Sequence, residues 1–259
     1  MTLCALQQSQ EYTRALCAMG VCAHSDETSG VHSITRGPLW AATRVGTDVD
    51  FSKIRRHAGK RFCVVSPDVQ SPLSLRRAGF RQIMTPATVA EIDLQQPLTQ
   101  HVKWRNGLHK AQSSPLRSCH RAFDATKDKW LLNADHIQQK ERKFKSLPHD
   151  VIRNWPLKNT HVSIAHLNKT PVAGMIFLRN GQTITYQIGW TDAVGRAHNA
   201  HQLLLHEAIE TFVKRKLSRL DLGTVDSVNN PGLTRFKVRA GATLRPLGGT
   251  WIAWPRWRS

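Results

Sequence analysis

A phenylalanine–lysine pair, Phe236 and Lys237, lies in the middle of the stretch NPGLTRFKVRAG, which follows the strand-like run RLDLGTV. The stretch predicts a short helix, because Pro231 comes early in it and Gly241 stands at its end. A lysine on the apolar side of this helix can stabilise negative charge in a partly dry cleft, or hold a phosphate or carboxylate. The alternative is a structural lysine whose aliphatic stem covers Phe236 while its amine reaches water.

Other polar side chains nearby are further candidates for chemistry. Asp226 follows the strand-like run and could take a proton from a substrate, or it could cap the turn before the helix. Tyr186, in the run TITYQIG, is a candidate to line a substrate pocket or to be an ordinary core tyrosine. His198 and His201 suggest a base or a metal site. No carboxylate or cysteine has the spacing to complete a metal site, so no metal is predicted.

Residues 160–254 contain the elements that must position these side chains. The runs HVSIAHL, VAGMIFL and TITYQIG predict three strands, and Asn180-Gly181 between the last two is a strong hairpin signal. A helix over 201–216 is predicted by one apolar face, which comprises Leu204, Leu205, Ala208, Ile209, Phe212 and Val213. The predicted order is therefore three strands, helix, strand, helix and one or two closing strands.

The first part of the chain predicts a smaller α/β unit over residues 31–94. The runs DFSKIRRHAGK and PLSLRRAGF predict short helices, whereas RFCVVSP and TVAEIDL predict strands. A basic helix is expected over 98–112, and a charged helical segment follows it until Pro148 interrupts it. A further helix is expected from Gln8 to Met19.

The element order over 160–254 resembles the core of the GNAT superfamily of acyl-CoA-dependent N-acyltransferases. The last helix carries the most specific match, because Asn230, Leu233, Phe236, Lys237 and Gly241 fall at the offsets of the family pattern. Many members have a general-acid tyrosine where this chain has Lys237. For acyl transfer, the resemblance implies that Lys237 stabilises the carbonyl oxygen, with Asp226 and Tyr186 as further catalytic candidates.

The segment KWRNGLHKA resembles the connecting helix of the FemAB-type transferases and of the related BioF2-like acetyltransferase domains. Lys103, Arg105, Leu108, Lys110 and Ala111 match its pattern, and the Phe-Lys pair before a glycine is a second match. The resemblance implies an α/β (α+β) fold of two GNAT-like halves, each a mixed, mostly antiparallel twisted sheet flanked by helices. The first half, residues 1–94, is degenerate, and residues 95–259 form the catalytic half. Substrate-binding roles are implied for Arg105, Lys110 and Phe236.

The stretch TDAVGRAHNAHQLL lies where GNAT proteins bind the pyrophosphate of CoA at a helix N-terminus. It supplies Gly195, Arg196 and Asn199 as candidate donor-binding residues, together with Asn230. It has a single glycine and not the usual spacing, so a simple turn is the alternative reading.

The composition is strongly basic, with 37 Lys and Arg against 18 Asp and Glu, a formal net charge of +19. The charges are dispersed along the chain, and they favour either a solvated surface or a partner that carries phosphate. Five cysteines without a repeated CxxC spacing favour reduced thiols. No signal peptide and no apolar run of membrane-spanning length are seen, so a cytoplasmic location is expected.

Two classes of function follow from these observations. The first is an enzyme that transfers an acyl group from acyl-CoA, for example acetyl-CoA, to an amine by direct attack without a metal. An aminoacyl-tRNA donor, as in peptidoglycan-bridge transferases, is the related alternative, and the net charge of +19 suits RNA. The second class is an inactive GNAT-fold module that binds RNA or a protein partner.

Overall fold

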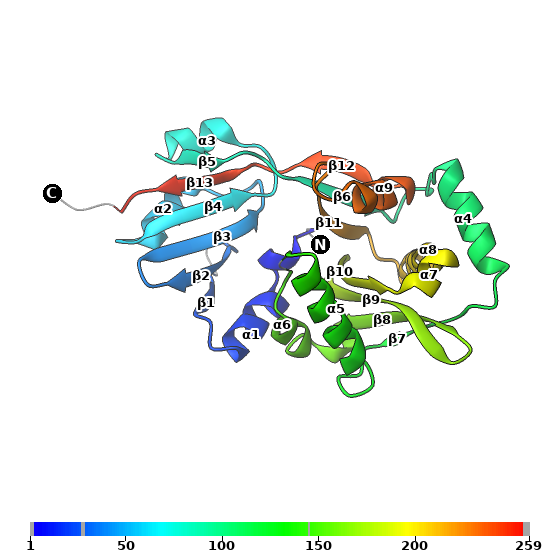
Figure 1. Ribbon diagram of the computed structural model, residues 1–259. Helices are drawn as coiled ribbons and strands as arrows, with labels where there is room; N and C mark the ends of the chain where they lie inside the picture. Colours follow the sequence, from blue (N-terminus) through cyan, green and yellow to red (C-terminus); the bar gives the residue numbers. More distant parts are fainter. Residues whose placement is uncertain (1–2, 27–28, 145, 256–259) are drawn as a thin grey trace. The chain divides into compact units, whose positions relative to one another are not determined.

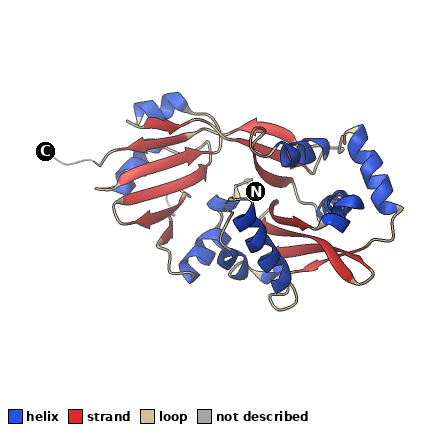
Figure 2. Ribbon diagram, in the orientation of Figure 1, coloured by secondary structure: helices blue, strands red, loops and turns tan. Residues whose placement is uncertain are grey.

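The computed structural model describes residues 3–26, 29–144 and 146–255, and they form two compact units. One unit is Ala90–Leu244. The other is Cys4–Val89, which is joined by residues 245–255 from the C-terminal end. The two halves of the α/β fold predicted by the resemblance are thus present, each with its own sheet (Figures 1 and 2).

The first unit is built on a six-stranded sheet in the order β1-β2-β3-β4-β13-β5. Neighbouring strands are antiparallel except β3 and β4, which are parallel. The strands are β1 (Ala23–Ser25), β2 (His32–Arg36), β3 (Leu39–Val45), β4 (Phe62–Pro67), β5 (Arg81–Met84) and β13 (Thr250–Ala253). The helices are η1 (Leu6–Gln8), α1 (Gln10–Ala18), α2 (Phe51–Ala58) and α3 (Pro72–Arg77).

Local sequence explains why α2 and α3 begin and end where they do. Asp50 caps α2 by accepting hydrogen bonds from the amides of Ser52 and Lys53. Gly59 ends α2 in a positive-φ conformation that favours glycine. Both helices turn their apolar residues to one core, which includes Ile54, Leu75, Val65 and Trp251.

Two strands were predicted in the wrong half of the molecule: the strand at residues 88–93, predicted in the first half, belongs to the sheet of the second unit, and the last strand belongs to the sheet of the first. The sequence analysis assigned residues 245–259 to the catalytic half, but β13 pairs with β4 and β5 of the first sheet. Trp251 and Ala253 alternate toward the core, where Val65 and Cys63 are their cross-strand partners. This pairing joins residues almost 190 positions apart, and local periodicity carries no information about such a pairing.

The second unit is built on a seven-stranded sheet in the order β12-β6-β11-β10-β9-β8-β7. Its strands are β6 (Thr88–Asp93), β7 (Arg117–Ala122), β8 (Thr160–Leu167), β9 (Thr170–Asn180), β10 (Thr183–Thr191), β11 (Arg219–Val225) and β12 (Thr243–Pro246). Its helices are α4 (Val102–Gln112), α5 (Lys129–Glu141), α6 (His149–Arg153), η2 (Leu157–Asn159), α7 (Ala193–Ala197), α8 (Ala200–Lys214) and α9 (Pro231–Arg239).

Helices cover both faces of the second sheet. Helix α8 buries Leu204, Ala208 and Phe212 in a core that also contains Met175 and Phe177 of β9. On the opposite face, α5 approaches β9 so closely that a Cβ at Gly174 would lie 2.9 Å from the side chain of Leu131. The predicted helix over 201–216 and the predicted Asn180-Gly181 hairpin are both present.

Strands β10 and β11 separate partway along their length. They pair in parallel only at Thr183–Arg219, Ile184–Leu220 and Thr185–Asp221, after which both strands continue without pairing to each other. A bulge in β10 between Tyr186 and Ile188 begins at the same level. Because the bulge bends the strand, it turns the end of β10 away from β11 and leaves an opening in the sheet.

Among the described residues, no helix combines the length and the apolar character that a membrane crossing requires.

Candidate active site at the opening between β10 and β11

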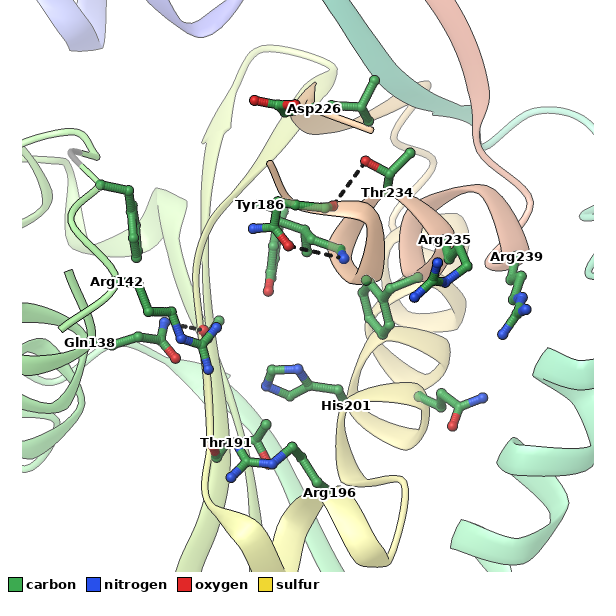
Figure 3. Close-up of a pocket in the computed structure, with 18 of the residues that line it drawn as sticks. Gln138, Arg142, Tyr186, Thr191, Arg196, His201, Asp226, Thr234, Arg235 and Arg239 are labelled. Carbon is green, nitrogen blue, oxygen red and sulfur yellow. Dashed lines mark hydrogen bonds between the residues drawn. The ribbon is translucent and has the colours of Figure 1, made fainter. Parts of the chain in front are cut away.

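A cavity of about 1080 Å³ lies at the separation of β10 and β11, entirely within the second unit. Its wall includes Tyr186, Gln187 and Gly189 of β10 and Thr224 and Val225 of β11. Helix α5 and the loop after it close one side, and α8 and α9 close the other (Figure 3). The size suits a ligand larger than a simple amine, since ligand pockets commonly measure about 300–1,000 Å³.

The cavity is strongly basic. Six cationic side chains line it: Lys103, Arg142, Lys143, Arg196, Arg235 and Arg239. The acidic side chains among its described lining residues are Asp135 and Asp226. The excess of cations in a concave site attracts ligands that carry phosphate or carboxylate groups.

Tyr186 stands in the middle of the site, on the bulged part of β10 (Figure 3). Its hydroxyl packs against the backbone at Gly189, where an added Cβ would lie 1.6 Å from the oxygen. Burial raises the pKa of the Tyr186 phenol, and the charge of Asp135 raises it further. The phenol therefore remains protonated at neutral pH and is available as a hydrogen-bond donor.

The turn before α8 is shaped by close backbone approach. A Cβ at Gly195 would lie 2.3 Å from the carbonyl oxygen of Val172, so glycine is required there. The amide of Gly195 donates to Oδ1 of Asp192 at 2.7 Å, and Nη1 of Arg196 donates to the carbonyl oxygen of Thr191 at 2.8 Å. Asn199 precedes the helix in the left-handed conformation, with φ 55°.

The first turn of α8 faces the cavity through Ala200, His201 and Gln202. The N-terminal turn of a helix presents amide groups without intrahelical partners and a positive dipole end. Gly195, Arg196 and Asn199, the predicted donor-binding residues, lie together at this end of the cavity. A helix N-terminus beside an arginine is chemically suited to an anion, but the amide of Gly195 itself is already engaged by Asp192.

His201 is a neutral imidazole directed into the cavity (Figure 3). Burial lowers its pKa to about 4, and the positive charges of Arg196 and Arg142 add to this effect. Its Nε2 lies 2.9 Å from the carbonyl oxygen of Trp190 and must carry the proton of the neutral ring to donate there. Nδ1 is thus left as a hydrogen-bond acceptor.

Asp135 is a buried carboxylate in the cavity wall that the sequence analysis did not single out. It lies on α5, is 3% exposed, and is held through Oδ2 by Nε2 of His149 at 2.7 Å and Nε2 of Gln139 at 2.6 Å. Gln139 also donates to Ser146 at 2.8 Å, which ties the loop after α5 to the same network. Such a fixed negative charge in a basic cavity is suited to binding a cationic amine.

The structure places Lys237 differently from the expectation. Its side chain is buried, with 4% exposed, and it is not among the residues that line the cavity. Its Nζ donates to the carbonyl oxygen of Thr224 at 2.7 Å, so it lies behind the β11 wall and not in the opening. Burial lowers the pKa of Lys237 to about 8, and the charge of Asp221 partly opposes this. The predicted snorkelling alternative also differs from the structure, because the amine does not reach water.

Asp226 and Asn230 line the cavity, but their side chains serve the local backbone. Asp226 accepts hydrogen bonds from the amides of Val228 and Asn229 and from the side-chain amide of Asn229. These hydrogen bonds lower the pKa of Asp226. Asn230 caps α9 by accepting from the amide of Leu233 at 3.3 Å. The capping alternative for Asp226 therefore describes its contacts.

Phe236 contributes an aromatic wall to the cavity. Its ring lies 5.0 Å from the ring of Trp104 and 6.0 Å from that of His201, measured between centroids. The indole N–H of Trp104 is buried and has no hydrogen-bond partner among the described residues. A buried donor of this kind is costly to leave unpaired, so a polar ligand atom would gain from reaching it.

Arg105 and Lys110, the other predicted substrate-binding residues, are exposed and do not line the cavity. Their helix, α4, instead contributes Lys103 and Trp104. The physical reason is helix geometry, because residues two apart point about 200° away from each other and seven residues span roughly 10 Å of helix. Arg105 thus points away from Lys103, and Lys110 lies two turns beyond it.

Comparisons with known proteins agree with the geometry of this site. The family model described as "Acetyltransferase (GNAT) domain" matches residues 111–238. A search of curated protein sequences finds no match. Among solved structures, FemX is similar with a TM-score of 0.76 at 12% identity, over 96% of this chain and 92% of that chain.

Two further solved structures extend the likeness. The C-terminal domain of a putative lysylphosphatidylglycerol synthetase from Agrobacterium fabrum is similar with a TM-score of 0.66 at 13% identity, over 95% of this chain and 88% of that one. A tandem GNAT protein from the clavulanic acid biosynthesis pathway has a TM-score of 0.51 at 9% identity, over 86% of this chain and 78% of that chain. Residues 111–238, which include α8, the separated strands and nearly all of α9, therefore carry a GNAT acetyltransferase domain, and the two-sheet fold of the chain is similar to that of FemX.

Proposed function

We propose that the protein transfers an acyl group from acyl-CoA to an amine acceptor by direct attack within a ternary complex, without a metal. The observation that carries this proposal is the basic cavity of about 1080 Å³ at the point where β10 and β11 separate. Beyond Thr185 and Asp221, the facing edges of the two strands no longer pair with each other. An extended donor arm that contains amides can form hydrogen bonds with the backbone N–H and C=O groups of these edges.

The donor phosphates are proposed to bind in two places. The first turn of α8 with Arg196 and Arg142 forms one cationic corner, and both arginines lie close enough to His201 to lower its pKa. Lys103 of α4 and Arg235 and Arg239 of α9 form a second cluster on the cavity wall. Two separate cationic clusters suit a donor that carries a pyrophosphate and a further phosphate group, as CoA does.

The reaction is proposed to take place beside Tyr186. The acceptor nitrogen attacks the thioester carbonyl carbon, the C–N bond forms, the C–S bond breaks, and the leaving thiolate takes a proton from the Tyr186 hydroxyl. Asp135 attracts the amine as a cation, which releases one proton to solvent before its neutral nitrogen attacks. The nitrogen then loses a second proton, for which His201 Nδ1 is the acceptor proposed. The phenol then recovers its proton from His201 or from solvent.

Lys237 is proposed as a positioning residue for this reaction. Its Nζ holds the carbonyl oxygen of Thr224, which lies in the cavity wall on β11. A buried lysine of this kind keeps the β11 edge at a fixed distance from β10. Phe236, the neighbour of Lys237, presents its ring to His201 and so shapes the same opening. Asp226 is proposed to keep the loop before α9 in place.

Aminoacyl-tRNA is the second candidate donor. The amide of Gly195 is occupied by Asp192, so the turn before α8 offers fewer free amides to a pyrophosphate than its position suggests. The net charge of +19 and the likeness of the fold to FemX and to a lysylphosphatidylglycerol synthetase domain also favour an aminoacyl donor.

Ligand-induced shifts in melting temperature would distinguish these donors. With an acyl-CoA donor, acetyl-CoA stabilises the protein with weak dependence on salt, and Arg196→Ala raises its Kd on the order of tenfold because one charge-assisted contact is lost. Lys214→Ala, at the other end of α8, is the matched control and leaves the Kd unchanged. Stabilisation by tRNA alone, lost steeply as salt rises, would favour the second donor. No shift with either ligand would contradict both and favour an inactive module.

A further inference from the structure

Along the edge strand of the first sheet lies a group of exposed arginines and large apolar side chains, those of α3 on the core side and Arg81 with Trp254 on the opposite face. It comprises Leu73, Arg76 and Arg77 of α3, Arg81, Ile83 and Met84 of β5, and Trp254, and we name it the β5 edge surface. Strand β5 is the outermost strand of its sheet, and all four of its residues are exposed. Helix α3 directly precedes it, and Trp254 reaches it from the chain beyond β13, where its ring lies 5.7 Å from the Arg81 guanidinium carbon.

The apolar side chains of this surface are unusually exposed. Leu73 is 67% exposed, Met84 63%, Ile83 53% and Trp254 49%. Isolated exposed apolar residues are common on proteins. Several on one helix–strand unit indicate a surface that binds a membrane or a partner molecule. An exposed edge strand such as β5 is also a site that proteins normally protect.

The chain segment that carries most of this surface is strongly basic. Between Phe51 and Thr88 there are eight lysines and arginines and one acidic residue, Asp68. Asp68 is already engaged by Arg44 and by Nη2 of Arg245, the latter at 3.0 Å. The exposed cations Lys60 and Arg61 extend the positive charge beyond the β5 edge surface. The partner must therefore be anionic.

We propose that the β5 edge surface docks the protein on a membrane rich in anionic phospholipid. The arginines would pair with lipid phosphates while Leu73, Ile83, Met84 and the Trp254 ring enter the boundary between headgroups and acyl chains. Arginine and tryptophan suit this boundary because each joins an apolar body to a polar end.

Other occupants fit the surface less well. A second copy paired through β5 would bring the same set of arginines from both chains together, which is unfavourable. RNA would use the cations and the Trp254 ring, but Leu73, Ile83 and Met84 are aliphatic, so most of the apolar area would stay exposed to water beside RNA. The docking proposal is independent of the proposed transferase activity, since the surface and the cavity belong to different units.

Sedimentation of the full chain with lipid vesicles tests the proposal. The protein is expected to bind vesicles of equimolar phosphatidylglycerol and phosphatidylcholine and to remain unbound with phosphatidylcholine alone. The triple variant R76Q/R77Q/R81Q is expected to lower the partition coefficient on the order of 100-fold. The triple variant L73S/I83S/M84S is expected to lower it at least about tenfold, even at low salt.

Matched controls separate a local surface from general charge. K214Q/K216Q removes two exposed cations of the second unit, and I137S/L157S removes two exposed apolar side chains there. Both should bind anionic vesicles like the parent chain. Unchanged vesicle binding by the two β5-surface variants would overturn the proposal. So would binding of tRNA without vesicle binding, or an oligomer in sedimentation velocity that only L73S/I83S/M84S abolishes.

Discussion

The two sheets of this protein each contain a parallel pair of neighbouring strands, and the pairs differ in how far they run. In the first sheet, β3 and β4 pair from Leu39–Phe62 to Val45–Pro67, almost the full length of β3. In the second sheet, β10 and β11 pair at three positions and then separate. The large cavity lies at that separation. A cavity has thus been made by ending a strand pairing early.

The two sheets also differ in the side chains that lie beside their parallel pairs. In the first, β13 lies between β4 and β5 and places the fully buried Trp251 in the core. In the second, the opening is bordered by Tyr186, whose ring is partly buried beside the core, and by cationic side chains. The first sheet is therefore closed by a large apolar residue from the end of the chain, and the second remains open to a ligand.

Removing the closing residue of the first sheet should have the largest effect. Trp251→Ala is expected to lower the free energy of unfolding by about 3–5 kcal/mol, since it leaves a large cavity in the core. Urea-induced unfolding would measure this. Trp254→Ala, an exposed neighbour, is the control and should change the unfolding free energy by less than about 0.5 kcal/mol. Equal effects of the two substitutions would show that β13 does not hold the first sheet together.

The buried lysine behind the open sheet should make stability depend on pH. The pKa of Lys237 is lowered from 10.5 to about 8 in the folded chain, so between these values the unfolded chain binds more protons. Stability conferred through this group therefore rises from pH 8 to pH 10.5, by on the order of 3 kcal/mol. Lys237→Met should abolish this rise when the two proteins are unfolded in urea across that range. Parallel pH curves for both would contradict the burial of a charged amine.

Narrowing the opening should impair transfer more than folding. Gly189→Ala places a Cβ where the Tyr186 hydroxyl now lies, so the phenol must move. We expect kcat/KM to fall on the order of 100-fold, since small misplacements of reacting groups are costly. Gly232→Ala, on the cavity-lining part of α9 with open space at its Cβ, is the control and should retain activity. Normal turnover by Gly189→Ala would exclude Tyr186 from the reaction.

The two acidic residues of the cavity should differ in importance. Asp135→Asn removes the buried charge that faces the amine, and we expect kcat/KM to fall about tenfold through a higher KM for the acceptor. Asp226→Asn keeps an oxygen that accepts from the loop amides, so activity should stay within about threefold. Steady-state kinetics with varied acceptor would measure both. A larger loss for Asp226→Asn would restore it as the proton acceptor.

Several residues that line the cavity were predicted, most of them through the family resemblance. Gly195, Arg196, Asn199, Asn230, Phe236 and Tyr186 were predicted from their places beside a helix start, on the last helix or on a strand, and all line the cavity. Asp135, His149 and Arg142 were missed, because α5 and α6 carry no family pattern in the sequence analysis. Asp135 follows Leu131 by four positions and Leu132 by three, so it falls on the apolar side of the helix, and that spacing could have indicated it.

By itself, the sequence determined the order of strands and helices over 160–239, the presence of a smaller α/β unit before them and the excess of positive charge, because periodicity, caps and turn residues act over short distances. Only the tertiary structure decided that β13 returns to the first sheet and that β10 and β11 separate after three pairs. It also decided that Lys237 bonds to Thr224 behind the wall and does not face the cavity. The position of β13, the separation of β10 and β11 and the contact of Lys237 all depend on how segments distant in sequence pack together. Local sequence patterns carry no information about such contacts.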